Sequence, residues 1–199
     1  MNNHQSTNNN PVLCFIRGLP GSGKSYFANN LFKSIDTDQK ILLDPDSTDY
    51  ESEEYKKHVV QQTNEGVDPK LFPYRFLRAQ AYEAIERRKI ILWNQPLSNL
   101  EILQKVITRL EEHAQENGVL LQIMFIEVEI DPEIARQRIV ERKNNGGHGP
   151  SNDVFTRFVN DYGSIKHLGY ETISIDGLRE SDLYIPKVLE IVQKLQKVT

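Results

Sequence analysis

The sequence predicts an α/β fold, in which a parallel sheet is covered by helices on both faces. Short apolar runs alternate with helical segments along the whole chain, and neighbouring parallel strands need such helical crossovers. A glycine-rich segment follows the first apolar run directly. The length of 199 residues fits one domain. A chain of this size buries about 70% of its unfolded surface, which is enough for a core without disulfide staples.

Five apolar runs bounded by turn residues are the expected strands. They cover residues 12–17, 40–43, 90–93, 119–128 and 171–175. Between and after them, helical patterns cover residues 25–33, 51–63, 74–89, 99–117, 132–143, 153–162 and 181–197. Ser98 is expected to cap the 99–117 helix, and Asp131 followed by Pro132 marks the start of the next one. The element order is therefore that of a three-layer sandwich.

Composition and charge disfavour nucleic-acid-binding, disulfide-bonded and membrane-spanning classes of protein. With 24 Lys and Arg against 28 Asp and Glu, the net charge is −4, which disfavours non-specific nucleic-acid binding but permits a local basic pocket. The single cysteine, Cys14, excludes an internal disulfide and indicates a reducing compartment, so we expect a cytoplasmic protein. No apolar run is long enough to span a membrane, and we expect no membrane partner. Residues 1–11 are polar and Asn-rich and are expected to be a loose tail before a single domain over 12–199.

The segment from Gly18 to Ser25 reads GLPGSGKS and fits G-x-x-x-x-G-K-[ST] at every fixed position. Glycines let successive backbone N–H groups turn inward and form an anion site with the start of the next helix. Lys24 supplies a positive charge for the β- and γ-phosphates, and the Ser25 hydroxyl suits Mg²⁺. The motif predicts a P-loop NTPase sandwich that binds ATP and Mg²⁺. The expected nucleotide-binding residues are Gly18, Pro20, Gly21, Ser22, Gly23, Lys24, Ser25 and Tyr26.

The rest of the chain favours a small-molecule kinase over other P-loop proteins. There is no N-K-x-D-type segment for reading guanine, and the third strand ends in Trp93-Asn94, not in the acid pair typical of motor and AAA-type ATPases. A kinase needs a carboxylate near the γ-phosphate to accept a hydroxyl proton. Asp46 follows the second strand, at the edge of the sheet where ligands bind. The alternative is that Asp46 only forms a turn.

A kinase also needs a lid that brings positive charge to the phosphates and excludes water. Arg138 and Arg142 are four residues apart and share one face of a helix. Gly146-Gly147 follows them and provides freedom for a hinge. We therefore expect a helical lid at about 138–158. The alternative is a solvated charged helix followed by a polar loop.

Three segments resemble the zeta-toxin-like branch of the P-loop kinases, which is similar to polynucleotide kinase and the small-molecule phosphotransferases. Besides the glycine loop, they are Arg138-x-x-x-Arg142-x-x-x-Gly146-Gly147-His148 with Pro150 and Arg157-Phe158 behind it, and the step Asp44-Pro45-Asp46. The resemblance implies that Asp46 is the general base. It implies that Arg142, with Arg138 as the alternative, contacts the transferring phosphoryl group beside Lys24. If the chain is a toxin, it also implies an antitoxin-like protein partner.

The departures from the family lie on the acceptor side. Asp49 stands where the family has an arginine, and Asn94 stands where the third strand commonly ends in an acidic or Thr-rich segment. Arg75 and Arg78, one turn apart on the helix before the third strand, are candidate replacements that would bind an anionic acceptor together with Asn94. The alternative is that both arginines are surface residues of an amphipathic helix.

The leading hypothesis is an ATP-dependent kinase that phosphorylates a hydroxyl of a small nucleotide- or sugar-like acceptor. One alternative is a catalytically silent nucleotide-binding interaction module, motivated by Asp49 and Asn94. Another is a nucleic-acid end kinase, which the acidic charge balance disfavours. His148 is interpreted as ordering its loop or contacting the adenine side, more than as a catalyst.

Overall fold

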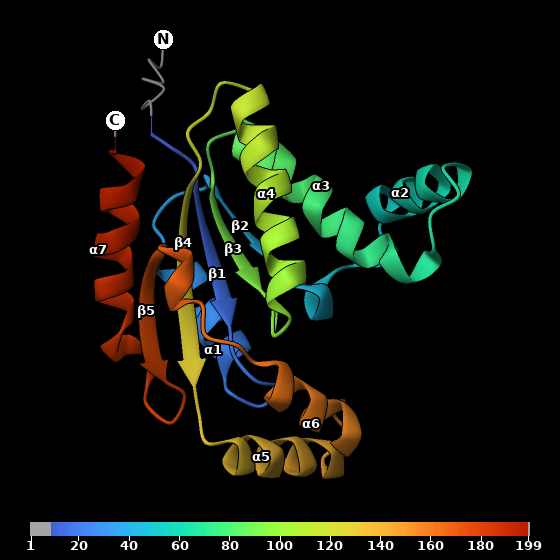
Figure 1. Cartoon of the computed structure of the whole chain (residues 1–199), viewed down its shortest axis with the longest axis vertical. Helices are drawn as coiled ribbons and strands as arrows, with labels where there is room; N and C mark the ends of the chain where they lie inside the picture. Colours follow the sequence, from blue (N-terminus) through green and yellow to red (C-terminus); the bar gives the residue numbers. More distant parts are fainter. Residues whose placement is uncertain (1–8, 199) are drawn as a thin grey trace.

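The computed structural model describes residues 9–198 and contains a five-stranded parallel sheet in the order β2-β3-β1-β4-β5 (Figure 1). This confirms the predicted α/β sandwich. The strands are β1 Val12–Arg17, β2 Lys40–Leu43, β3 Ile90–Asn94, β4 Gln122–Glu129 and β5 Glu171–Asp176. The central strand β1 pairs with β3 on one side and with β4 on the other.

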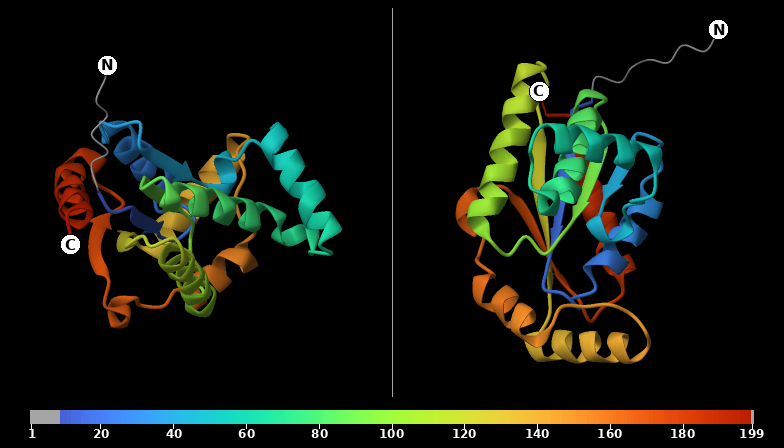
Figure 2. Two further views of the ribbon diagram at one scale, coloured as in Figure 1. Left: turned by 90° about the horizontal axis from the view of Figure 1, so that it is seen from above. Right: turned by 90° about the vertical axis from the view of Figure 1, so that its right-hand side faces the viewer.

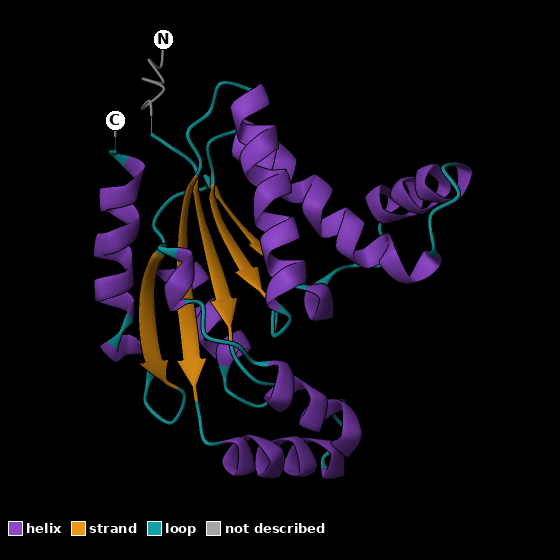
Figure 3. Ribbon diagram, in the orientation of Figure 1, coloured by secondary structure: helices purple, strands orange, loops and turns teal. Residues whose placement is uncertain are grey.

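Helices cover both faces of this sheet (Figure 2). On one face lie α1 Lys24–Ser34 and α7 Ile185–Gln196, and on the other lie α3 Phe72–Glu86 and α4 Leu100–Glu116. The short helix α2 Glu53–Asn64 packs on α3 away from the sheet, and α5 Pro132–Asn144 and α6 Asn152–Asp161 cross the carboxyl edge of the strands (Figure 3).

Alternation along β1 divides the core into two layers. Val12, Cys14 and Ile16 pack against α1 and α7, while Leu13 and Phe15 pack against α3 and α4. A strand buried on both faces reads as a continuous apolar run, because neither face meets water. Burial raises the pKa of the Cys14 thiol to about 12, so this cysteine is a neutral core residue.

A third, smaller apolar cluster attaches α5 and α6 to the glycine loop. It consists of Leu19, Ala135, Ile139 and Phe155. As predicted, the Asp131 side chain caps α5 by accepting hydrogen bonds from the backbone N–H groups of Glu133 and Ile134. The segment after β4 therefore docks over the carboxyl edge.

Some boundaries differ from the prediction. The side chain that caps α4 belongs to Asn99 and not to Ser98, and β4 begins at Gln122, three residues later than expected. Residues 1–8 of the expected tail lie outside the described part. Asn10 and Pro11 are buried, and the Asn10 N–H donates to the Gln196 carbonyl at 2.9 Å, so ordered structure begins earlier than we expected. No helix within residues 9–198 is long and apolar enough to cross a membrane.

Candidate functional site

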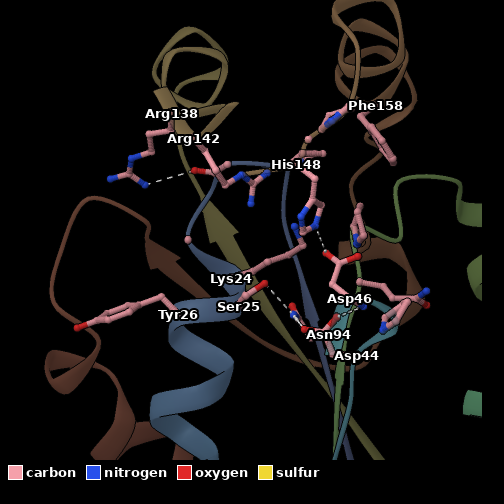
Figure 4. Close-up of a pocket in the computed structure, with 18 of the residues that line it drawn as sticks. Lys24, Ser25, Tyr26, Asp44, Asp46, Asn94, Arg138, Arg142, His148 and Phe158 are labelled. Carbon is pink, nitrogen blue, oxygen red and sulfur yellow. Dashed lines mark hydrogen bonds and ion pairs between the residues drawn. The ribbon is translucent and has the colours of Figure 1, made fainter. Parts of the chain in front are cut away.

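A cavity of about 570 Å³ opens at the carboxyl edge of the sheet, where the glycine loop, the turn after β2, the end of β3 and the lid meet (Figure 4). The strand order places β1 between β3 and β4, so segments distant in sequence surround one space. Seven predicted site residues lie outside the glycine loop, and the cavity brings five of them together. Its lining includes Asp46, Asn94, Arg138, Arg142 and Tyr26, and excludes Arg75 and Arg78.

The glycine loop has the backbone of an anion cradle. Gly21 and Gly23 have φ angles of 86° and 94°, a conformation that L side chains rarely adopt. A Cβ at position 21 would overlap the Ala135 carbonyl of α5. Helix α1 begins at Lys24 with no side-chain cap and no acidic residue in its first turn. Its first N–H groups are therefore left for an anion.

The Lys24 ammonium group is close enough to Asp44, Asp46 and Arg142 for their charges to act on it. Burial lowers the pKa of the Lys24 ammonium group to about 8, although Asp46 and Asp44 act to raise it. The positive charge of Arg142 lowers it further. A partly desolvated ammonium group gains more from a bound phosphate than one in bulk water, because local electrostatics are stronger.

Ser25, Asn94 and Asp44 form a hydrogen-bonded row across the floor of the cavity. The Asn94 Nδ2 donates to Ser25 Oγ at 3.0 Å and to Asp44 Oδ2 at 2.6 Å. Asp44 is 7% exposed, and its other oxygen accepts from the Asp46 N–H at 2.9 Å. Asp44 was missed as a site residue, because in sequence it looks like a turn former; its place directly after a buried strand was the available signal.

The same row has the chemistry of a magnesium site. Mg²⁺ prefers hard oxygen ligands and keeps several waters, and Ser25 and Asp44 supply a hydroxyl and a carboxylate. The buried Oδ1 of Asn94 accepts no hydrogen bond from any residue in 9–198, so an acceptor oxygen is left for a ligand or its water. These residues fit Mg²⁺, and Ser25 and Asp44 would hold it beside the phosphates of a bound nucleotide.

Asp46 projects from the turn into the open part of the cavity. Its side chain is 72% exposed, and its Oδ2 lies 3.9 Å from His148 Nε2 in the lid loop. In Figure 4, Lys24, His148 and Asp46 point toward one another across the cavity. An incoming hydroxyl can therefore reach this carboxylate while the lid residue lies above it.

The two lid arginines, Arg138 and Arg142, have different surroundings. The Arg138 guanidinium donates to the Gly177 carbonyl at 3.1 Å and reaches the Gly21 carbonyl at 3.4 Å. It thus bridges the glycine loop and the loop after β5. Arg142 lies in the last turn of α5, beside Lys24. Of the two, Arg138 is engaged with backbone carbonyls, and the contact of Arg142 with a phosphoryl group stays a prediction.

Three predicted residues lie elsewhere or point elsewhere. The Tyr26 side chain is 58% exposed, is directed away from the carboxylates (Figure 4), and donates to Glu180 at 3.4 Å. Arg75 and Arg78 line a second cavity of about 580 Å³. Asn94 lies under the phosphate cradle and does not line that second cavity.

A parallel sheet in this order, with a glycine cradle after its central strand and a helical lid over its carboxyl edge, defines a P-loop kinase-like protein. Residues 13–161 match the family described as "AAA domain". The chain belongs to that family, even though β3 ends in Asn94 and not in the acid pair that we associated with AAA-type ATPases. No curated protein matches the chain by sequence.

Solved structures share the fold at low sequence identity. A putative kinase from Chloroflexus aurantiacus superposes with a TM-score of 0.64 at 14% identity, covering 94% of this chain and 98% of that one. A gluconokinase from Sinorhizobium meliloti gives 0.56 at 14% identity, covering 96% and 95%. The PezAT toxin–antitoxin system of Streptococcus pneumoniae gives 0.56 at 15% identity, covering 94% and 85%. At these identities the likeness shows the fold alone.

Proposed function

We propose that the protein is an ATP-dependent kinase that transfers the γ-phosphoryl group to a hydroxyl of a small acceptor. The observation that carries the proposal is that the exposed carboxylate of Asp46 lies in the same cavity as the phosphate cradle and close enough to affect the charge of Lys24. A nucleotide switch or a silent binding module has no need of a free carboxylate at that place.

In this proposal, each residue of the site has its own role in phosphoryl transfer. The glycine loop and Lys24 hold the β- and γ-phosphates, and Ser25 and Asp44 would hold Mg²⁺, which supplies charge neutralisation on the phosphate oxygens. The acceptor oxygen forms its bond to the γ-phosphorus while the bond to the bridging oxygen of ADP breaks. The hydroxyl proton passes to the Asp46 carboxylate, and Arg142 stabilises the charge on the transferring group.

The proposal is tested by acceptor-stimulated ADP release over a panel of sugars, nucleosides and their phosphates. Asp46→Asn is expected to lower kcat by about 10²–10⁴ while ATP affinity is unchanged. Asp68→Asn is the matched control, because the exposed Asp68 carboxylate accepts a comparable turn hydrogen bond from the Lys70 N–H at 2.9 Å and lines neither cavity. Full activity in Asp46→Asn contradicts the assignment of the base, and no stimulation by any acceptor favours the silent module.

The antitoxin-like partner that the resemblance implies and the alternative of a nucleic-acid end kinase both stay predictions. The structurally similar PezAT system is a toxin–antitoxin system, and a polynucleotide end is an acceptor that the panel above does not include. Short oligonucleotides with a free 5′-hydroxyl therefore belong in the same assay. Their phosphorylation in preference to small acceptors would replace the small-molecule assignment.

A further inference from the structure

A second cavity adjoins the nucleotide cavity and is called the annex here. It is bounded by α3, the loop after β3, and α4. Its walls are largely apolar and include Trp93, Leu97 and Val106. It shares Tyr74, Gln95, Pro96 and Phe158 with the nucleotide cavity. A molecule seated in the annex therefore lies next to the space that contains Asp46.

Positively charged side chains line the annex, although the chain as a whole is acidic. Arg75 and Arg78 enter it from α3, and Lys105 and Arg109 enter it from α4. Within the described part of the chain, no Asp or Glu lines this cavity, although the net charge of the protein is −4. Four cations around one apolar space form an environment that favours an anion.

Two of the four cations are already paired. Lys105 forms an ion pair with Glu101 at 2.5 Å. Arg75 donates to Gln62 Oε1 at 2.9 Å and lies 3.9 Å from Glu65. The guanidinium groups of Arg78 and Arg109 have no hydrogen-bond or ion-pair partner among residues 9–198.

The unpaired arginines also act on each other. Burial lowers the pKa of the Arg78 guanidinium, the Tyr82 hydroxyl raises it, and the charges of Arg109 and Arg75 lower it further. Like charges held together in a half-buried place cost free energy, and a bound anion removes that cost. A guanidinium pair matches the oxygens of a phosphate better than a point charge does, because it donates in a planar fork.

We propose that the annex binds the phosphate monoester group of the acceptor through Arg78 and Arg109, with the organic part of the acceptor on the apolar wall and its free hydroxyl directed to Asp46. This rests on the proposed kinase function and narrows its substrate to small phosphorylated alcohols. The dianionic charge of a phosphate monoester balances two unpaired guanidinium groups, whereas a carboxylate balances one.

The test measures binding, so that it does not depend on turnover. The protein is first saturated with Mg²⁺ and a non-hydrolysable ATP analogue, which fills the phosphate cradle. Phenyl phosphate, benzoate and phenol are then titrated by calorimetry. Phenyl phosphate is expected to bind about tenfold or more tightly than benzoate, and phenol more weakly than both. Arg78→Gln and Arg109→Gln are each expected to weaken phenyl phosphate binding by about tenfold or more.

The matched control is Arg87→Gln, since Arg87 follows the same helix but is exposed and paired with Glu83 at 2.8 Å. Its binding is expected to equal that of the parent. If all three variants lose the same amount of phenyl phosphate affinity, the effect comes from the overall charge of the protein and the proposal is overturned. Phenyl phosphate that binds no more tightly than phenol would also overturn it. Tighter binding of benzoate would overturn the phosphate in favour of a carboxylate. Phenyl phosphate binding that depends on Arg78, in a protein that phosphorylates no acceptor, overturns the kinase function but leaves the anion site in place.

Discussion

The guanidinium of Arg17 lies 4.2 Å from the centre of the Tyr162 ring, joining the last residue of β1 to the end of the lid helix α6. Arg17 is fully buried. It pairs with Glu127 on β4 at 3.2 Å and donates to the Gly163 carbonyl at 3.1 Å. The residue that leads into the glycine loop thus also holds the segment that leaves the lid.

Arg17→Met is expected to destabilise the fold by about 3 kcal/mol, because it leaves the Glu127 carboxylate buried without its counter-charge. Thermal and urea unfolding measure the loss. The double variant Arg17→Met/Glu127→Leu is expected to be more stable than the single one. An Arg17→Met protein within about 1 kcal/mol of the parent, as expected for an exposed pair, would show that the ion pair is unimportant.

ATP binding is expected to take up protons in mildly alkaline solution. Burial lowers the pKa of Lys24 from 10.5 to about 8 in the free protein, so the ammonium charge is complete below that pH and is lost as pH rises through it. Bound phosphates raise the pKa again. ATP affinity therefore falls as pH rises above 8, and the uptake is largest between pH 8 and the higher pKa of Lys24 in the ATP complex. Calorimetry in two buffers of different ionisation enthalpy measures it. A Lys24→Arg variant, charged throughout this range, is expected to show no uptake; an uptake equal to that of the parent would assign the titration to another group.

Asp44→Asn is expected to weaken binding of Mg²⁺–ATP by about tenfold, since a carboxylate beside the metal is replaced by a neutral amide. ATP affinity without Mg²⁺ is expected to stay the same or to improve, because a negative charge near the phosphates is removed. Fluorescent-nucleotide titrations with and without Mg²⁺ separate the two effects. A parallel loss in both conditions would mean that Asp44 supports only the backbone of the turn.

Gly21→Ala is expected to lower both stability and ATP affinity. The substitution strains the backbone at a positive φ and drives a Cβ into the Ala135 carbonyl of α5. Gly66→Ala is the control, because Gly66 has a φ of 70° but open space around its Cβ position. The control is expected to lose about 1 kcal/mol from strain alone. Equal losses in both variants would show that the contact between the glycine loop and α5 adds nothing.

Structure could be predicted from the sequence where the residues of one contiguous segment determine its conformation. Residues 40–43 are predicted as a strand with the observed bounds, and the helix expected from residue 25 after the glycine motif begins one residue earlier, at Lys24. Two features required the three-dimensional arrangement. Asp44 joins Asn94 only because β2 and β3 are neighbours. Arg109 joins Arg78 only because α3 and α4 lie on the same face of the sheet. Strand order and helix packing are tertiary properties, so no local pattern predicts them.

Phe158 on α6 borders both the nucleotide cavity and the annex. Because Phe158 forms part of the wall of both cavities, a rotamer change that accommodates a ligand in one cavity also changes the shape of the other cavity. If either ligand fixes its rotamer, the second ligand meets a surface that is already set, and the two affinities become linked by the same factor in both directions. Measured separately, each ligand would then show an affinity that differs from the one it has when the other is present.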